Sequence, residues 1–307
     1  MKDIILKTHN ISKKFGEQVA VNNVNMTIKK GDIYGFIGRN GAGKTTLIRM
    51  ITGLININSG ELELLGESTN KEINEAREMI GSLVEMPSFY KNMTARENLE
   101  VSRLVRNIAG KECIDEVLEL VGLKDVEKKR FKNFSLGMKQ RLGIANALLG
   151  NPSFLILDEP TNGLDPVSIV KIRELLKKIN KEREVTILIS SHILTELSEL
   201  ATCYGIINNG KLLEEISSEQ LEEKCKKYIQ IKVDDAKSAV VLLEKELDIM
   251  DYIVVDENTI KVFNHLDLAS KINMVLSING IAVAEIGLKG QNLEGYFLNI
   301  IGGEQNA

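Results

Sequence analysis

A glycine-rich run has the residue types and spacing needed to bind nucleotide phosphates: Gly38-Arg39-Asn40-Gly41-Ala42-Gly43-Lys44-Thr45. It matches the phosphate-loop pattern G-x-x-x-x-G-K-[ST] in full. A loop that wraps a triphosphate must bring backbone N–H groups close to the anion, and glycine allows that approach. Lys44 would reach the β- and γ-phosphates, and the Thr45 hydroxyl would ligate Mg²⁺. We therefore expect nucleotide contacts at Gly38, Arg39, Asn40, Gly41, Ala42, Gly43, Lys44, Thr45 and Thr46.

The segments on either side of this loop must hold it in place. Ile33–Ile37 is a short apolar run that predicts a strand, and Lys44–Ile51 predicts a helix that Gly53 ends. Such a helix would direct the positive end of its dipole at the phosphates. A chance glycine-rich turn is the alternative for the motif alone, and the strand–loop–helix context argues against it.

Two adjacent carboxylates follow another apolar run. Phe154–Leu157 predicts a buried strand, and Asp158 and Glu159 come directly after it. At the carboxyl edge of a sheet beside a phosphate loop, Asp158 would hold Mg²⁺ and Glu159 would polarise the attacking water. A strand followed by a solvated acidic turn is the alternative for this pair taken alone.

The residues around this pair make the pattern specific. Two segments resemble, in the same order, the Walker B, D-loop and switch-histidine motifs of ABC ATPases. They are Asp158-Glu159-Pro160-Thr161-Asn162-Gly163-Leu164-Asp165 and Ser190-Ser191-His192. A third segment resembles the signature of that family, which is usually L-S-G-G-Q: Phe134-Ser135-Leu136-Gly137-Met138-Lys139-Gln140-Arg141. Ser135 and Gly137 match the signature, whereas Leu136 and Met138 depart from it.

The resemblance implies ATP as the nucleotide, Mg²⁺ as its ion and two protomers arranged head to tail. Each ATP would lie between the phosphate loop of one protomer and Ser135 and Gly137 of the other. His192 would contact the γ-phosphate and hold Glu159 and the water in place, and Asp165 would lie at the dimer seam. Helix caps are the alternative for Ser135 and Asp165.

Two further positions have an expected contact with the nucleotide or its ion. Glu85 stands where the family has a Gln that touches Mg²⁺ or its water and relays the nucleotide state to a permease. A carboxylate can replace that amide because Mg²⁺ prefers hard oxygen ligands; an exposed loop acid is the alternative. Phe15 lies ahead of the phosphate loop and could stack on adenine, and a core aromatic is the alternative.

The resemblance covers about residues 4–221 and narrows to a subgroup. The signature, Glu85 and the segment Leu293–Leu298 resemble ATPases of the bacitracin and lantibiotic exporter group. This implies an ATPase that powers a separate membrane permease for antimicrobial peptide or drug export, on the cytoplasmic face of the cell membrane. Its ATPase partner would be a second copy or a homologous subunit. There are two alternative classes of function. One is a non-transport ABC protein that acts on ribosomes or DNA, and the other is a small-molecule kinase or GTPase.

The pattern of elements predicts an α/β fold in two domains. Residues 1–221 form the expected ABC ATP-binding domain, with a β-rich layer, a parallel-sheet core and a helical insert at about 88–149, where Ile114, Val117 and Leu118 share a helix face. Residues 222–307 form the expected C-terminal α+β domain. Its order of strand, helix, strand, strand, helix, strand is ferredoxin-like, and a last helix follows.

Composition limits the remaining classes of function. The chain has 307 residues, a formal net charge of −4 and a pI near 5.7, so we expect no nucleic-acid partner. Its three cysteines lack the spacing of a zinc site or a disulfide framework, which favours the reducing cytosol. No apolar run approaches the roughly 18 residues that span a bilayer.

Overall fold

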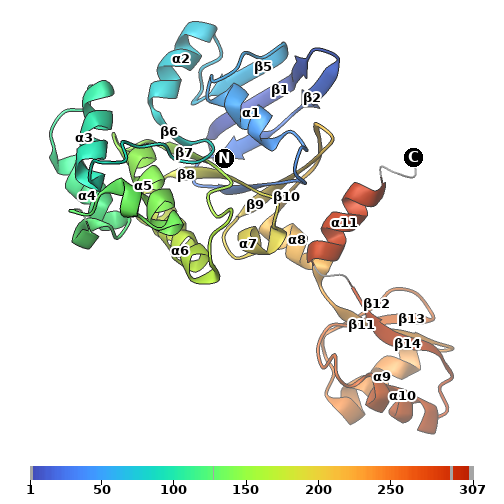
Figure 1. Cartoon of the computed structure of the whole chain (residues 1–307). Helices are drawn as coiled ribbons and strands as arrows, with labels where there is room; N and C mark the ends of the chain where they lie inside the picture. Colours follow the sequence, from blue (N-terminus) through green and yellow to red (C-terminus); the bar gives the residue numbers. More distant parts are fainter. Residues whose placement is uncertain (1–2, 127, 291–292, 304–307) are drawn as a thin grey trace. The chain divides into compact units, whose positions relative to one another are not determined.

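The computed structural model describes residues 3–126, 128–290 and 293–303. The chain divides into two compact units, Met1–Ser218 and Glu219–Ala307 (Figure 1). Within the described residues, no helix combines the length and the apolar character that crossing a membrane requires.

An antiparallel sheet forms the β-rich layer that the sequence predicts. Its strand order is β2-β1-β3, and β5 pairs with the central strand β1. The strands are β1 (Ile4–Phe15), β2 (Gln18–Val24), β3 (Thr27–Lys29) and β5 (Ser59–Leu64). Leu6 and Ile11 on β1 are fully buried. They share one apolar cluster with Leu47 and Ile48 of helix α1 (Lys44–Ile51) and with Phe154 of strand β7 (Phe154–Asp158). The helix after the phosphate loop is therefore packed between two sheets.

The second sheet of the first unit has the order β10-β9-β4-β8-β7-β6. Its strands are β4 (Ile33–Ile37), β6 (Ile80–Leu83), β7 (Phe154–Asp158), β8 (Thr186–Ser191), β9 (Cys203–Asn208) and β10 (Lys211–Ser217). All neighbours are parallel except β9 and β10, which confirms the predicted parallel core. Ile37 pairs with Ser191, and Asp158 with Ser190, so these strands end at one edge. That edge holds the phosphate loop, the two carboxylates and His192.

Helices complete the first unit. The predicted helical insert contains α3 (Ala95–Val105), α4 (Glu112–Leu120) and α5 (Leu136–Leu148), which pack against one another. Each of them has a fully buried leucine: Leu99, Leu118 and Leu142. A capping box of Thr94 and Glu97 fixes the start of α3. This unit also contains α2 (Asn70–Glu78), α6 (Pro166–Arg183) and α7 (Leu194–Ser198). Helix α8 (Ser218–Cys225) starts at the last residue of this unit, and its other residues belong to the second unit.

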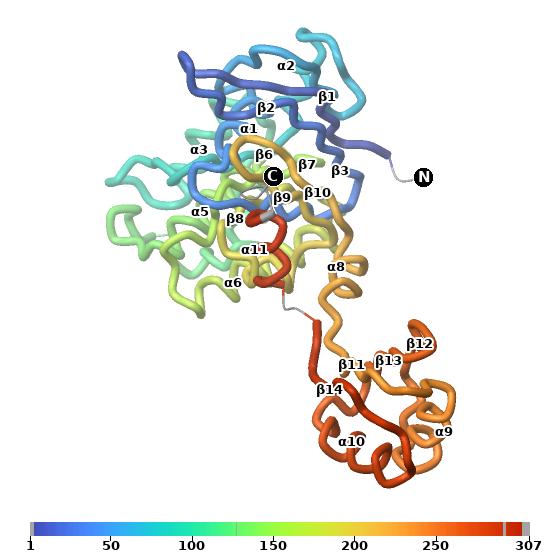
Figure 2. The backbone as a smooth tube through the Cα atoms, turned by 90° about the vertical axis from the view of Figure 1, so that its right-hand side faces the viewer, coloured from blue at the N-terminus to red at the C-terminus, as the bar shows by residue number. Residues whose placement is uncertain are grey.

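The second unit has an antiparallel sheet of order β12-β13-β11-β14. Its elements follow the predicted order along the chain: β11 (Tyr228–Val233), α9 (Ala236–Leu247), β12 (Tyr252–Val254), β13 (Thr259–Val262), α10 (Ala269–Ile278), β14 (Val283–Lys289) and α11 (Leu293–Gly303). Helices α9 and α10 cover one face of the sheet (Figure 2). They bury Leu243 and Ile272 against Ile231 and Ile260, which gives this unit its own core.

Candidate nucleotide-binding site

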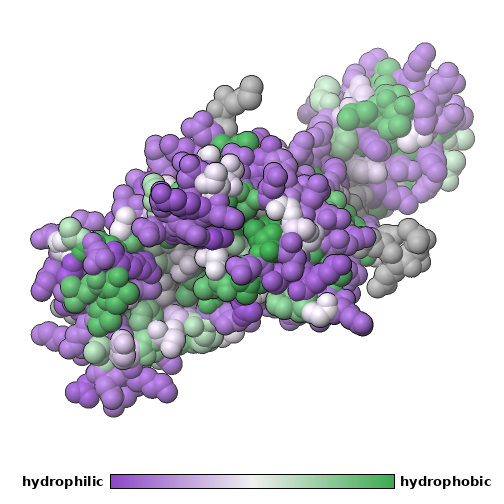
Figure 3. Space-filling model, turned by 90° about the horizontal axis from the view of Figure 1, so that it is seen from above, coloured by the Kyte–Doolittle hydropathy of each residue, from purple (hydrophilic) through white to green (hydrophobic). Residues whose placement is uncertain are grey.

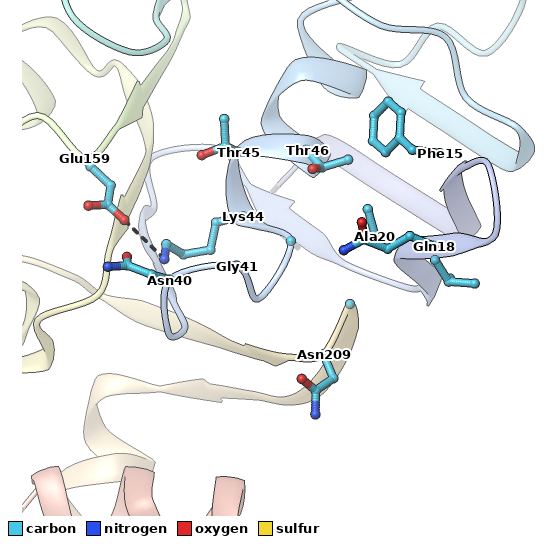
Figure 4. Close-up of a pocket in the computed structure, with 13 residues that line it drawn as sticks. Phe15, Gln18, Ala20, Asn40, Gly41, Lys44, Thr45, Thr46, Glu159 and Asn209 are labelled. Atoms are coloured by element: carbon cyan, nitrogen blue, oxygen red, sulfur yellow. Dashed lines mark ion pairs between the residues drawn. The ribbon is translucent and has the colours of Figure 1, made fainter.

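A cavity of about 450 Å³ opens at the carboxyl edge of the parallel sheet, where the phosphate loop follows β4 (Figure 4). Its lining comes from the end of β1, the start of β2, the phosphate loop, the start of α1 and the turn between β9 and β10. Glu159, the candidate catalytic carboxylate, completes it. The lining residues are Phe15, Gln18, Val19, Ala20, Asn40, Gly41, Gly43, Lys44, Thr45, Thr46, Glu159, Asn209 and Gly210.

Glycine is required in the loop for two physical reasons. Gly43 is the N-cap of α1 and has φ 109°, in the left-handed region that favours glycine. A Cβ atom at Gly43 would lie 2.6 Å from the Ala20 carbonyl oxygen, and one at Gly38 would lie 2.6 Å from the Ile207 carbonyl oxygen. The loop is therefore pressed against β2 and β9, and the N-terminus of α1, where backbone N–H groups bind anions, borders the cavity.

The ammonium of Lys44 lies among oxygen atoms although the side chain is only 4% exposed. It donates to the carbonyl oxygens of Gly38 at 2.7 Å and Arg39 at 3.2 Å. It also forms an ion pair with Glu159, with 3.1 Å between Nζ and Oε1 (Figure 4). A phosphate that binds in the cavity would therefore compete with Glu159 for this charge.

The predicted carboxylates and the switch histidine are brought together. Glu159 Oε2 lies 2.8 Å from Nδ1 of His192, and Oε1 faces Lys44. Asp158 is 5% exposed and does not line the cavity, and its Oδ1 accepts a 2.6 Å hydrogen bond from the Ser190 hydroxyl. The interpretation of this pair as a solvated acidic turn is wrong, because Asp158 is buried and Glu159 is held by a cation and a histidine.

Phe15 and Glu85 occupy different environments. Phe15 is 50% exposed at the cavity and has the Lys13 ammonium 5.3 Å from its ring centroid, so it is not a core aromatic. Glu85 is outside the cavity lining, has φ 66° and pairs with Arg49 in the last turn of α1. The structure thus brings Phe15, but not the Glu85 carboxylate, to the phosphate loop.

Comparison with known proteins identifies the family. Residues 21–162 match the family model described as ABC transporter. The chain is 50% identical over 299 residues to the bacitracin transport ATP-binding protein BcrA of Bacillus licheniformis, covering 97% of this chain and 98% of that protein. This chain is an ABC transporter ATP-binding protein. As a member of that family it is an ATPase that binds and hydrolyses ATP.

Two further similarities concern the ATPase unit. The lantibiotic transport ATP-binding protein SrtF of Streptococcus pyogenes is 44% identical over 223 residues, or 71% of this ABC ATPase and 95% of that protein. A solved dimeric post-hydrolysis state of the ATP-binding cassette MJ0796, bound to ADP and Pi, superposes with a TM-score of 0.63 and 26% identity. The match covers 70% of this chain and 99% of that one.

Three candidate residues of this ABC ATPase do not line its own cavity and belong to two helix starts that touch each other. Ser135 caps α5 by accepting from the Met138 N–H at 3.3 Å, and Asp165 caps α6 by accepting from the Ser168 N–H at 2.9 Å. Hydrogen bonds from Ser168 lower the pKa of Asp165. A Cβ atom at Gly137 would meet Ser168 Oγ at 2.9 Å, so the beginnings of α5 and α6 touch here. The helix-cap interpretations of Ser135 and Asp165 are confirmed.

The remaining loop residues support the cavity without lining it. Ala42 is buried behind the loop, and Arg39 is exposed outside the cavity lining. Gly38 packs beside Ala42, because a Cβ atom at Gly38 would lie 3.1 Å from that of Ala42.

Sequence reasoning missed the residues that β2 and the β9–β10 turn contribute. Asn209 and Gly210 have φ 46° and 78°, and Asn-Gly is a strong signal for a tight hairpin turn. Gly210 donates to the Ala42 carbonyl oxygen at 2.9 Å and accepts from the Asn22 N–H at 2.8 Å. The Asn209-Gly210 dipeptide could have predicted the turn. No local pattern in the sequence indicates that this turn packs between β2 and the phosphate loop.

Proposed function

We propose that this ABC ATPase drives a separate membrane permease that exports an antimicrobial peptide or a related drug and so confers resistance. The observation that carries the ATPase chemistry is Glu159 held between Lys44 and His192 at the cavity. The cargo class is supported by the bacitracin relative, because its similarity extends through both units of this chain. The lantibiotic relative supports the same class through the ATP-binding unit.

In this proposal the cavity residues divide the work of hydrolysis. Backbone N–H groups of the loop and the Lys44 ammonium bind the phosphates, and Phe15 stacks on the adenine. When a phosphate takes over Lys44, the Glu159 carboxylate is released from its ion pair and can accept a proton from the attacking water. His192 keeps Glu159 oriented through the 2.8 Å contact and donates toward the γ-phosphate.

The oxygen donors near the cavity suit Mg²⁺. The described residues contain no group of three His, Cys, Asp or Glu side chains that could hold a metal, and Mg²⁺ does not need one, because it is usually bound by one or two carboxylates, substrate phosphates and waters. Thr45, through its hydroxyl, and Asp158, through its carboxylate, would hold the ion. When bound, Mg²⁺ neutralises phosphate charge in the reaction. Glu85 joins this set only after leaving Arg49.

The adjacent helix starts at Ser135, Gly137 and Asp165 form the proposed surface for a second ATPase subunit. They are absent from the lining of the chain's own cavity, which fits a head-to-tail dimer of two copies, or of this chain with a homologous ATPase. Each ATP would lie between one phosphate loop and the other subunit's Ser135 and Gly137, where free N–H groups of α5 can bind the γ-phosphate. The dimeric MJ0796 cassette supports this arrangement.

The permease would dock at the helical insert from the cytoplasmic side of the membrane. A cavity of about 630 Å³ lies between the segment that follows β6 and helices α3 and α5. Met86 and Tyr90 beside it are 59% and 61% exposed, and Leu104 and Val105 at the end of α3 are also exposed. Hydrophobic residues gather at the left of Figure 3, the side where Figure 1 places α3 and α4.

We propose that residues 1–221 form the ATP-binding domain and residues 222–307 a C-terminal domain. The order β12-β13-β11-β14 with two helices on one face supports a ferredoxin-like fold for the second of these.

The cargo and permease can be tested together. The protein is purified from its native membrane to identify the permease that accompanies it, and both chains are then expressed in a bacitracin-sensitive bacterium. We expect the pair to raise the tolerated bacitracin concentration and the pair with Glu159→Gln to leave it unchanged. Equal tolerance with and without the pair would contradict the cargo proposal while leaving the ATPase assignment intact.

A further inference from the structure

Ser190, on the neighbouring strand β8, contacts both Asp158 and Glu159. It is the penultimate residue of β8, its side chain is fully buried, and its backbone pairs with Asp158 at the end of β7. Its Oγ lies 2.9 Å from the backbone nitrogen of Glu159 and 2.6 Å from Oδ1 of Asp158. One hydroxyl group therefore touches both residues that the reaction is expected to use.

The direction of the two hydrogen bonds is fixed by chemistry. The Glu159 N–H can only donate, so Ser190 Oγ accepts from it. The single Ser190 proton is then available to the Asp158 carboxylate, which accepts it. Asp158 thus orients the hydroxyl, and the oriented hydroxyl holds the backbone of Glu159.

Glu159 needs such support because its backbone is strained. Its φ is 46°, in the left-handed region that residues other than glycine rarely adopt, and such strain persists only where the surroundings enforce it. In this conformation the side chain contacts Lys44 through one oxygen and His192 through the other. A turn that relaxed to negative φ would carry the carboxylate away from both partners.

We propose that Ser190 is a positioning residue for ATP hydrolysis, which fixes the strained turn that aims the Glu159 carboxylate. The inference rests on the proposed role of Glu159 as the group that accepts the proton from water. It extends that role by naming what holds the carboxylate in place. Ser190 is not among the residues that line the cavity, so it would act on the reaction through the residues it contacts, Glu159 and Asp158.

Ser190→Ala removes the hydroxyl and keeps the strand. We expect kcat for ATP hydrolysis to fall by about 10- to 100-fold, as for other residues that orient a reacting group. The KM for ATP should stay within about threefold, because Lys44 and the loop N–H groups do not depend on the hydroxyl. Unchanged kcat would overturn the proposal, and so would a rise in KM with kcat preserved.

Thr186→Val is the matched control on the same strand. Thr186 is also fully buried, and its hydroxyl accepts the Gly31 N–H at 2.9 Å, away from the carboxylates. Thr186→Val should lower the melting temperature, as Ser190→Ala should, but its kcat should stay at the wild-type value. A similar loss of kcat in both variants would show a general effect of losing a buried hydroxyl and would contradict the positioning role.

A double-mutant cycle with Glu159→Gln separates this inference from the proposed function. If Ser190 acts through Glu159, adding Ser190→Ala to Glu159→Gln should lower the remaining kcat by less than about threefold, because effects of residues that act as a unit are not additive. A further loss as large as in the wild-type background would overturn the positioning role. Wild-type kcat in Glu159→Gln alone would instead overturn the proposed function.

Discussion

At the scale of single residues, one cation contacts the carboxylate that we propose as the catalytic base. Lys44 is almost fully buried, and its ammonium is shared between two loop carbonyl oxygens and Glu159. The triphosphate of ATP carries more negative charge than the Glu159 carboxylate and would compete with it for the same ammonium. The arrival of ATP would therefore couple phosphate binding to the release of Glu159.

Lys44→Ala should weaken ATP binding by about 10- to 100-fold, the loss that corresponds to hydrogen bonds with a charged group. Titration of fluorescent ATP into the purified protein measures the affinity. Lys181→Ala, at an exposed lysine in the last turn of α6, is the control and should bind as wild type. Equal affinity for Lys44→Ala and the control would show that this ammonium does not face the phosphates.

Glu85 is the second residue whose partner should change. It pairs with Arg49 here, and both side chains are exposed, so the pair adds little stability and can open. Glu85→Gln should keep ATP binding and much of the hydrolysis. Glu85→Ala should lower export more than ATPase activity, because it removes the oxygen that would link the nucleotide ion to the permease.

Cells that carry the matched permease provide the readout for Glu85. Arg49→Ala is the companion variant, because it removes the competing cation and leaves the carboxylate. We expect Arg49→Ala to retain more export than Glu85→Ala. Wild-type export by Glu85→Ala would identify Glu85 as an exposed loop acid without a role in coupling.

At the scale of elements, the turn between β9 and β10 helps to shape the nucleotide cavity. Gly210 has φ 78°, and a Cβ atom there would lie 2.8 Å from the Ala20 carbonyl oxygen. Gly210→Ala should lower the free energy of unfolding by about 1–3 kcal/mol through backbone strain, and it should also weaken ATP binding.

Gly280→Ala is the control for backbone strain alone. Gly280 has φ 83°, and a Cβ atom there would have no other atom within 4 Å, so only conformational strain applies. This variant should be destabilised while its ATP affinity is unchanged. Urea unfolding and ATP titration of both variants make the comparison, and equal ATP affinity for the two would remove the turn from the site.

Much of the fold could be predicted because its signals are local. The bounds of β4 and α1 agree with those expected from the sequence, and the phosphate loop is one contiguous motif. The contacts of Ser190 and Gly210 could not be predicted. They form only when strands that are far apart in the sequence pair with each other in one particular register. Glu85 was assigned by family position, and its pairing with Arg49 needs the three-dimensional arrangement of α1 and β6.

At the scale of the whole molecule, nucleotide binding should belong to the first unit. Every residue that lines the nucleotide cavity precedes residue 211, and each unit has an apolar core of its own. A chain ending at Leu221 should therefore bind ATP with the affinity of the full chain. Calorimetric titration measures this, and a folded, soluble truncated protein without ATP binding would show that the domain boundary or the site is wrong.

ATP turnover by Glu159→Gln tests the central assignment most directly. The substitution keeps the size of the side chain but removes the charge that pairs with Lys44 and that we propose accepts a proton from water. We expect ATP to remain bound, an ATP-bound dimer to accumulate, and kcat to fall by about 10²- to 10⁴-fold, as for the loss of a general base. Turnover near the wild-type value, measured as phosphate release at saturating ATP and Mg²⁺, would remove Glu159 from this role.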